Sequence, residues 1–451
     1  MMSTDTLPAV DTGRITALAS ELRELLGDAA VSDEDAALER VSVDGSTLSP
    51  VIMEKLPLGR AQLVAYPADA ESIALAIGAA VRHGVPITPR GKGTGNYGQA
   101  IPMAGGLVLD MSKARTIVEV GDGYLIADAG APMIQIEQAA NKTGQQVLMF
   151  PSTVQSTVGG FVSGGSGGTG SIKHGMLTSI VGGYVRSLEV VHAEPDAHLI
   201  HLDAEAAHNY LHNYGVTGII ARVEVALEPQ QQWSSLYASF ADFHDAFAII
   251  REVAALEPTP RLVSADVPTL ADALPADEAL PAGKASLRVI LDESTVDAAT
   301  ALIEKAGGTV EAVRPGLQNT MKLSMVSYNH PIEWLQKAYP GVYFHIEVGG
   351  DALVDRIDEV HEIYPGAMLH LEAMAQGTPG GMLAAPYTGE AELLAGFERM
   401  RAIGVGYHNP HQWFVDWEPE RSVELAKTTD PHGLLNPGKL QEPTVDTGRK
   451  R

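Results

Sequence analysis

The chain has 451 residues, which is more than one hydrophobic core usually holds, so two or three domains are expected. Its formal net charge of −25 repels phosphate backbones and anionic lipid surfaces, which argues against a nucleic-acid partner. There is no cysteine, so disulfides, thiolate metal sites and iron–sulfur clusters are excluded.

The sequence contains no run of about 18 apolar residues, so no membrane span is expected. The first residues lack the basic and apolar regions of a secretory signal, and the cytoplasm is the expected compartment. Both ends, 1–11 and 442–451, are polar and are expected to be loosely held tails.

The first half combines one amphipathic helix with strands that alternate with helices. Apolar residues at helical spacing predict a helix over 14–27, and Asp69 is a candidate N-cap for a second helix that ends near 83. A third helix is predicted from Pro132 to about Gly144. Strands are predicted at 62–67, 85–89, 106–111, 116–120, 124–130, 185–193, 198–203 and 215–229. The stretch 150–183 is rich in glycine and has no clear period.

The second half repeats a strand–helix–strand unit, which favours an antiparallel sheet backed by helices and an α+β fold overall. The Pro/Ala/Asp-rich stretch 268–285 is interpreted as a connection. The first unit is a strand at 233–240, a helix at 242–256 and a strand at 261–267. The second is a strand at 286–292, a helix to 306 and a strand at 309–313. The third is a strand at 342–348, a helix from 351 and a strand at 367–374.

Two glycine-rich loops follow apolar segments of the first half. They are PRGKGTGNYGQ (89–99) and STVGGFVSGGSGGTGS (156–171), which continues to Gly175. Glycine lets backbone N–H groups approach an anion closely, so two such loops can enclose a pyrophosphate. A single loop of this kind is usually a linker, but ordering two of them without a ligand would cost backbone entropy.

Both loops contain G-x-G-x-x-G, yet neither is expected to be a Rossmann fingerprint, because no helix is predicted to begin inside either motif. No P-loop pattern occurs.

The segment 60–229 resembles the FAD-binding domain of the vanillyl-alcohol oxidase and p-cresol methylhydroxylase family. The matching pieces are PADAESIALAIGAAVRHGVPITPRGKGTG, PSTVQSTVGGFVSGGSGGTGSIKHG, VGGYVRSLEVV and YGVTGIIARVEVALEP. The tail DPHGLLNPGKL (430–440) resembles the closing segment of glycolate-oxidase-type members. The resemblance implies an FAD-binding domain over 12–229, completed by 426–441, and a substrate domain over 230–425.

The resemblance also implies roles for individual residues. Arg90, Gly91, Lys92, Gly93, Thr94, Gly95, Thr157, Gly159 and Gly160 would hold the pyrophosphate. Ser166, Thr169, Ser171, His174 and Gly175 would lie near the ribityl chain and the flavin, and Pro151 and Gly164 complete the second loop. Gly218, Ile219 and Ile220 would meet the adenine side, and Asn436 and Lys439 would return to the cofactor from the tail.

FAD is expected to be bound non-covalently. Many members of the family tether the flavin through a His in the first loop, but Thr94 stands at that position, and a cysteinyl tether is excluded. A tether from a His of the second half stays open.

Two polar constellations in the second half are candidates for the proton acceptor that alcohol oxidation needs. They are YNHP (328–331) and YHNPHQW (407–413). His330 and His411 are the candidate bases because His titrates near neutral pH. Asn329, His408 and Tyr387 are further catalytic candidates, and Tyr407, Asn409 and Trp413 are candidate pocket walls. A lone His is more often a packing residue, so this interpretation depends on both groups lying in one domain.

No metal site is expected. The H-x-G-D-G-N and E-H-G-I-G runs of many D-2-hydroxyacid dehydrogenases with this architecture are absent.

The expected activity is FAD-dependent oxidation of a small alcohol, with a 2-hydroxy acid as the expected substrate class. Two alternatives stay open: an electron-transfer subunit with a vestigial pocket, and an NADPH-dependent flavin reductase. The expected partners are a small-molecule substrate and an electron acceptor, which is oxygen, a quinone, a cytochrome or a protein. A homodimer is left open.

Overall fold

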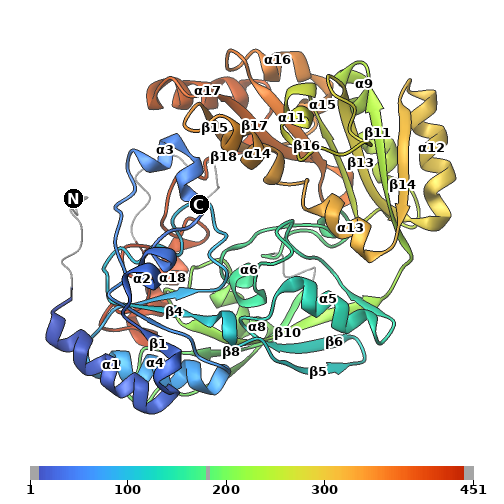
Figure 1. Ribbon diagram of the computed structural model, residues 1–451. Coiled ribbons are helices and arrows are strands. Elements are labelled where there is room, and N and C mark those ends of the chain that lie inside the picture. Colours follow the sequence, from blue (N-terminus) through green and yellow to red (C-terminus); the bar gives the residue numbers. More distant parts are fainter. Residues whose placement is uncertain (1–9, 179–182, 441–451) are drawn as a thin grey trace.

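The computed structural model describes residues 10–178 and 183–440 (Figure 1). Most of the two predicted tails, and residue 441 of the segment assigned to the first domain, lie outside the described residues. The helices and strands form two bodies, one coloured blue to green and one coloured yellow to orange in Figure 1. The expected α+β architecture with two domains is confirmed.

The first body contains two sheets. In the smaller one, β2, β4 and β3 are parallel and β1 is antiparallel to β2. The pairings in the larger sheet are antiparallel. The smaller sheet has the order β1 (Val31–Ser32), β2 (Leu63–Ala65), β4 (Leu107–Asp110) and β3 (Ile87–Arg90). The larger has the order β5 (Ile117–Gly121), β6 (Tyr124–Asp128), β10 (Ile219–Pro229), β8 (Val185–Val191) and β9 (Ile200–Asp203), and β7 (Gln145–Val147) also pairs with β10.

Helices cover these sheets, and α18 lies among elements of the first body although it is near the end of the chain (Figure 1). In α4, the predicted cap is present, because the Asp69 side chain accepts from Ser72 N at 2.8 Å. The helices are α1 (Thr12–Leu26), α2 (Asp35–Val41), α3 (Pro50–Met53), α4 (Ala70–Arg82), α5 (Met133–Asn141), α6 (Val158–Gly164), α7 (Ser171–His174), α8 (Ala204–Ala207) and α18 (Pro419–Thr429).

The tail after α18 joins the edge of the smaller sheet. Ile87 N donates to the Leu434 carbonyl, and Asn436 N donates to the Ile87 carbonyl, both at 2.7 Å. The chain therefore returns to the first body after it has formed the second.

The second body is built on one eight-stranded sheet whose pairings are all antiparallel, as predicted. Its order is β14 (Thr309–Pro315), β11 (Trp233–Phe240), β13 (Ala285–Asp292), β12 (Leu262–Asp266), β16 (Met368–Ala373), β17 (Pro379–Pro386), β15 (Tyr343–Gly349) and β18 (Gly406–His408). Its helices are α9 (Phe243–Ala248), α10 (Ile250–Ala254), α11 (Pro268–Ala273), α12 (Val296–Lys305), α13 (Leu317–Ser324), α14 (His330–Ala338), α15 (Ala352–Asp355), α16 (Ile357–His361) and α17 (Glu390–Ala402).

The two faces of this sheet differ in chemistry. Leu287, Ala265, Leu371 and other apolar residues alternate along the strands and pack in a core with helices such as α9 and α12. On the opposite face, three polar residues and one methionine stand in register on neighbouring strands: Asp266 is opposite His370, His370 is opposite Met382, and Met382 is opposite Glu347. This polar face forms part of the site described below.

The structure differs from the sequence expectations in several elements. The helix expected over 242–256 is divided at Ile249 into α9 and α10. The stretch 150–183, expected to lack regular structure, contains α6 and α7, and the connection 268–285 contains α11. The strands β17 and β18 were not predicted, because β17 (PGGMLAAP) has little of the β-branched and aromatic composition that favours strands and is held by neighbours on both sides.

Candidate FAD and substrate site

A cavity of about 540 Å³ lies where the two bodies meet, and both glycine loops contribute to its wall. The second body contributes residues of β15, β16 and β17 and the segment around His408 to Asp416. The volume of the cavity is in the range of pockets that hold cofactors and small ligands.

The two glycine loops touch each other at the base of this cavity. The hydroxyls of Thr94 and Ser156 are 2.8 Å apart. A Cβ on Gly91 would lie 2.1 Å from Thr157 Oγ1, and a Cβ on Gly159 would lie 2.6 Å from the Ala129 Cβ, so neither position has space for a side chain. Gly160 is exposed to the cavity, where a bare backbone lets a phosphate approach closely. The loops thus fit the pyrophosphate of FAD without needing many cationic side chains.

Twelve of the predicted cofactor residues line the cavity and nine do not. Those that line it are Arg90, Gly91, Lys92, Gly93, Thr94, Gly95, Pro151, Thr157, Gly159, Gly160, Gly164 and Ser166. Those outside the lining are Thr169, Ser171, His174, Gly175, Gly218, Ile219, Ile220, Asn436 and Lys439.

Several residues outside the lining support the loops. The Thr169 hydroxyl is 2.7 Å from that of Ser324, and Gly168 N donates to Ser171 Oγ at 2.9 Å. His174 Nε2 is 3.3 Å from a Glu228 carboxylate oxygen, at the outer edge of hydrogen bonding. Ile219 and Ile220 are buried in β10, where they form part of the core of the first body.

The tail residues act on the first loop rather than on the cavity. Lys439 Nζ donates to the carbonyls of Gly98 and Ile101, at 2.5 and 3.2 Å. Asn436 Nδ2 donates to the Gln99 carbonyl at 3.0 Å. Burial lowers the pKa of Lys439 to about 7, although Asp44 acts in the opposite direction. These contacts correct the expectation that both side chains reach the cofactor directly.

The Arg90 side chain also has a different role from the one expected. Its guanidinium donates to the Val43 carbonyl at 2.8 Å and to other carbonyls of residues 40–41 at 3.4–3.5 Å. Burial lowers the pKa of Arg90, with Asp110 and Asp44 opposing that shift. The guanidinium therefore anchors the loop to residues 40–43, and the backbone of the loop is left to face the cavity.

Three of the five catalytic candidates lie outside the cavity lining. His330 is buried at the contact between the two bodies, where Nε2 is 2.9 Å from Thr153 Oγ1 and Nδ1 donates to the Met325 carbonyl. His411 is buried against His345, and Tyr387 donates to Glu54 at 2.9 Å. Burial lowers the pKa of His330 and lowers that of His411 well below its ordinary value. The expectation that these two His residues are bases in the pocket is therefore corrected.

The two remaining candidates, Asn329 and His408, do line the cavity. His408 lies between two carboxylates: its Nδ1 is 2.9 Å from Glu347 Oε2, and its Nε2 is 2.5 Å from Asp416 Oδ2. Gln412 also donates to Asp416 Oδ2, at 2.8 Å.

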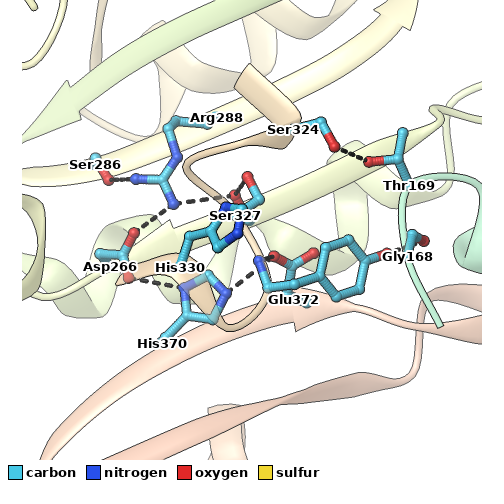
Figure 2. A network of polar contacts seen from close by, with 12 residues as sticks. Gly168, Thr169, Asp266, Ser286, Arg288, Ser324, Ser327, His330, His370 and Glu372 are labelled. Atoms are coloured by element: carbon cyan, nitrogen blue, oxygen red, sulfur yellow. Dashed lines mark hydrogen bonds and ion pairs between the residues drawn. The ribbon is translucent and has the colours of Figure 1, made fainter. Parts of the chain in front are cut away.

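The most buried polar group of the site is a chain of four charged side chains on the polar face of the eight-stranded sheet (Figure 2). Arg288 pairs with Asp266 at 2.5 Å, and Asp266 accepts from His370 Nδ1 at 2.7 Å. His370 Nε2 is 2.9 Å from Glu372 Oε1, which also accepts from Tyr328 N at 2.8 Å. His370 and Glu372 line the cavity, so the chain leads from the interior of the sheet to the site.

Electrostatics keep His370 protonated at neutral pH. Burial alone would lower its pKa, but Asp266 and Glu372 outweigh burial and raise the pKa to about 9. Arg288 and His370 lower the pKa of Asp266 despite its burial. The four side chains therefore alternate in sign and leave no net charge.

Glu372 has one carboxylate oxygen without a partner. Its Oε2 is buried and accepts no hydrogen bond from the residues that the structure describes, although the side chain is only 1% exposed. A buried acceptor without a donor is costly, so this atom is suited to accept from a bound ligand.

Sequence reasoning missed His370 and Glu372. They belong to the predicted strand 367–374, where alternation places them on the same face. Two charged residues on one face of an otherwise apolar strand were the available signal.

Among the described residues, no cluster of three or more His, Cys, Asp or Glu is arranged to hold a metal ion. Within the same residues, no helix is long and apolar enough to cross a membrane.

The family of FAD binding domains matches residues 61–203, which include both glycine loops. An uncharacterised FAD-linked oxidoreductase of Mycobacterium tuberculosis is 26% identical over 53% of this chain and 52% of its own length. The glycolate oxidase subunit GlcD of Bacillus subtilis is 28% identical over 46% of each chain. The chain thus matches about half the length of these relatives.

Two solved structures share the fold across nearly the whole chain. An alkyldihydroxyacetonephosphate synthase superposes with a TM-score of 0.72 at 15% identity, covering 97% of this chain and 89% of that one. A 4-ethylphenol oxidase from Gulosibacter chungangensis gives a TM-score of 0.64 at 16% identity, covering 96% and 98%. The resemblance described from the sequence is confirmed, and so is the expectation of FAD. The chain thus contains an FAD binding domain that includes the two glycine loops, and over about half of its length it is similar to FAD-linked oxidoreductases.

Proposed function

We propose that this protein oxidises the CH–OH group of a small alcohol, with FAD as the electron acceptor. The observation that carries the proposal is Glu372, which lines the cavity on the side of the second body and whose buried Oε2 has no donor among the described residues. The glycine loops form the wall contributed by the first body. A cofactor on one side and a proton acceptor on the other are the two parts that such an oxidation needs.

FAD supplies the acceptor for the hydride that leaves the carbinol carbon. In this proposal Glu372 Oε2 accepts the proton of the substrate hydroxyl, which becomes the carbonyl oxygen of the product. Tyr328 N and His370 Nε2 both bind Oε1, so they fix the carboxylate and leave its other oxygen without a partner among the described residues. Asp266 holds the His370 ring from its other side (Figure 2). The chain of contacts therefore orients the acceptor before substrate binds.

The expectation that the substrate is a 2-hydroxy acid is supported by the name of the Bacillus subtilis relative, which is a glycolate oxidase subunit. That relative matches less than half of this chain, so the substrate class depends on the pocket itself and is tested directly.

The first experiment is the visible spectrum of the purified protein before and after acid precipitation. We expect a flavin spectrum that moves to the supernatant, because the FAD is expected to be non-covalent. A colourless protein that cannot be reconstituted with FAD would contradict the proposal.

The second step is an anaerobic titration of the flavin with alcohols, 2-hydroxy acids and NADPH. Bleaching by an alcohol or a hydroxy acid supports the proposed oxidation. Bleaching by NADPH alone would instead favour the flavin reductase, and no bleaching by any of them would favour the electron-transfer subunit.

A further inference from the structure

The turn between α13 and α14 is bound to the second glycine loop. The Tyr328 hydroxyl donates to the Gly168 carbonyl, and the hydroxyls of Ser324 and Thr169 are 2.7 Å apart (Figure 2). Gly168 directly follows residues 163–167, which line the cavity. The turn is therefore attached to the loop next to the part of it that faces the cofactor site.

Gly168 is a fixed point of this loop. Phe150 N donates to the Thr169 carbonyl at 3.0 Å, and Gly170 N donates to the Arg261 carbonyl at 2.8 Å, so both bodies hold the backbone here. A Cβ on Gly168 would lie 2.0 Å from the Phe150 carbonyl oxygen, so the loop packs directly against the backbone of Phe150. A group that binds the Gly168 carbonyl is consequently held at a defined place beside the loop.

Tyr328 contacts Glu372 with its backbone while its side chain contacts the loop. Tyr328 N donates to Glu372 Oε1 at 2.8 Å. Both contacts are made with Tyr328 at a φ of 55°, a left-handed conformation that residues with a side chain rarely adopt. Such a conformation persists only where the surrounding structure determines it, and it often occurs at functional sites.

The phenol of Tyr328 stays protonated and remains a donor. Burial raises the pKa of Tyr328 well above its ordinary value, and the charge of Glu372 raises it further, whereas a hydrogen bond with Ser171 acts in the opposite direction. The contact with the Gly168 carbonyl is therefore kept at neutral pH.

We propose that Tyr328 is a positioning residue that fixes Glu372 relative to the second glycine loop, and hence relative to the FAD that the loop would hold. This inference rests on the proposed oxidation, because it concerns the same proton acceptor. The hydride acceptor and the proton acceptor must face one carbinol group, and a misplacement of about 1 Å can cost about 100-fold in rate. Since one residue joins the loop to the carboxylate, the two parts of the site keep one relative position.

A second tyrosine provides a matched control. The Tyr364 hydroxyl also donates to a backbone carbonyl, that of Leu393, at 2.6 Å, and its side chain is buried in the core of the second body. Tyr364 does not line the cavity. Tyr328→Phe and Tyr364→Phe therefore remove the same kind of hydrogen bond, one at the site and one outside its lining.

The test measures flavin reduction by anaerobic stopped flow, with the alcohol or 2-hydroxy acid that bleaches the unmodified protein in the titration above. The absorption spectrum first shows that each variant is loaded with FAD. In Tyr328→Phe the rate at saturating substrate should fall at least about tenfold, or about 1.4 kcal/mol, which is the scale of one lost hydrogen bond. The substrate concentration at half-maximal rate should change by less than about threefold, because Tyr328 acts on the acceptor rather than on substrate binding.

Tyr364→Phe should leave both quantities within about threefold of the unmodified protein, because a loss of stability alone does not change the rate of folded, FAD-loaded molecules. A loss smaller than about tenfold in Tyr328→Phe, or an equal loss in both variants, would overturn the inference.

Combining Tyr328→Phe with Glu372→Gln shows whether Tyr328 acts through Glu372. Residues that act as a unit have non-additive effects, so adding Tyr328→Phe to the Glu372→Gln protein should slow reduction by less than about threefold. A further loss of about tenfold would show that Tyr328 affects the rate by another route, and it would overturn the inference.

The same variants separate this inference from the proposed function. If Glu372→Gln slows reduction and Tyr328→Phe does not, the oxidation with Glu372 as acceptor stands and the positioning role is wrong. If Glu372→Gln does not slow reduction, Glu372 is not the acceptor, and both the proposed role of Glu372 and this inference are wrong.

Discussion

Glu372 differs from the other cavity-lining carboxylates of the second body in how its two oxygens are used. Oε1 accepts from Tyr328 N and lies beside His370, whereas Oε2 has no partner among the described residues. Tyr328 itself adopts a positive φ of 55°, a conformation that costs energy for a residue with a side chain. That conformation places its N–H on the carboxylate, which supports a role in orienting Glu372.

We predict the effect of Glu372→Gln on the rate of flavin reduction. The amide keeps an acceptor for Tyr328 N but cannot take a proton, so substrate-driven flavin reduction should fall at least about 100-fold, the scale of a lost general base. Stopped-flow reduction under anaerobic conditions measures the rate, and the flavin spectrum shows that FAD is retained. Glu398→Gln, an exposed change on α17, is the control. A rate within about threefold of the unmodified protein would rule out Glu372 as the proton acceptor.

The strands of the eight-stranded sheet bring residues that are far apart in the chain into one row of polar side chains. Asp266 and His370 are 104 positions apart, yet β12 and β16 are neighbours and place them opposite each other. Replacing both partners of a buried ion pair with apolar residues is often tolerated, but removing one charge leaves its partner uncompensated. The row is therefore expected to make stability depend on the protonation of His370.

The pH dependence follows from the raised pKa of His370. The pKa rises from about 6.5 in the unfolded chain to about 9 in the fold, so this stabilisation is complete below pH 6.5 and is lost as the pH rises through 9. The loss should be on the order of 3 kcal/mol, at about 1.4 kcal/mol for each pKa unit. Lys439, whose pKa is lowered to about 7, changes stability in the opposite direction, so the comparison needs a variant.

Denaturant unfolding of the unmodified protein and of His370→Gln between pH 6 and pH 10 isolates this contribution. The difference in unfolding free energy should shrink as the pH rises, because only the unmodified protein loses the imidazolium. A difference that stays constant over this range would show that His370 is not protonated in the fold.

The whole molecule encloses its site between two bodies that meet through polar contacts. Arg261 pairs with Glu137 at 2.7 Å and also donates to the Val147 carbonyl at 2.7 Å. Asn96 of the first loop donates to Glu333 at 2.8 Å, and Thr153, which lies just before the second loop, contacts His330. His330 therefore belongs to the contact between the bodies, and the loops that would hold FAD are part of that contact.

Removing FAD should consequently destabilise the molecule. A ligand that binds only the folded state at about 100 times its Kd adds about 2.7 kcal/mol of stability. Scanning calorimetry of the holoprotein and of the apoprotein should show a lower melting temperature without FAD, restored by added FAD. Riboflavin lacks the pyrophosphate and should not restore it. Identical melting curves with and without FAD would contradict a cofactor held between the loops.

The sequence by itself determined many of the local elements and the places where a phosphate could be bound. Apolar alternation predicted the strands that flank the loops, and runs of glycine predicted where a phosphate could approach the backbone, because both are properties of neighbouring residues. The residues of the cavity wall that the second body contributes could not be predicted in this way. The period of two in a strand assigns a residue to a face but does not say which strands lie beside it.

The tertiary structure decided that β13, β12, β16, β17, β15 and β18 are adjacent in that order. This order leaves His330 and His411 outside the cavity lining and brings Glu372, which His370 contacts, into the lining, where we propose it as the proton acceptor. It also placed Gly380 and Gly349 side by side next to that carboxylate. Pairing between strands that are distant in the chain fixed each of these positions, and the local sequence pattern does not specify which strands pair.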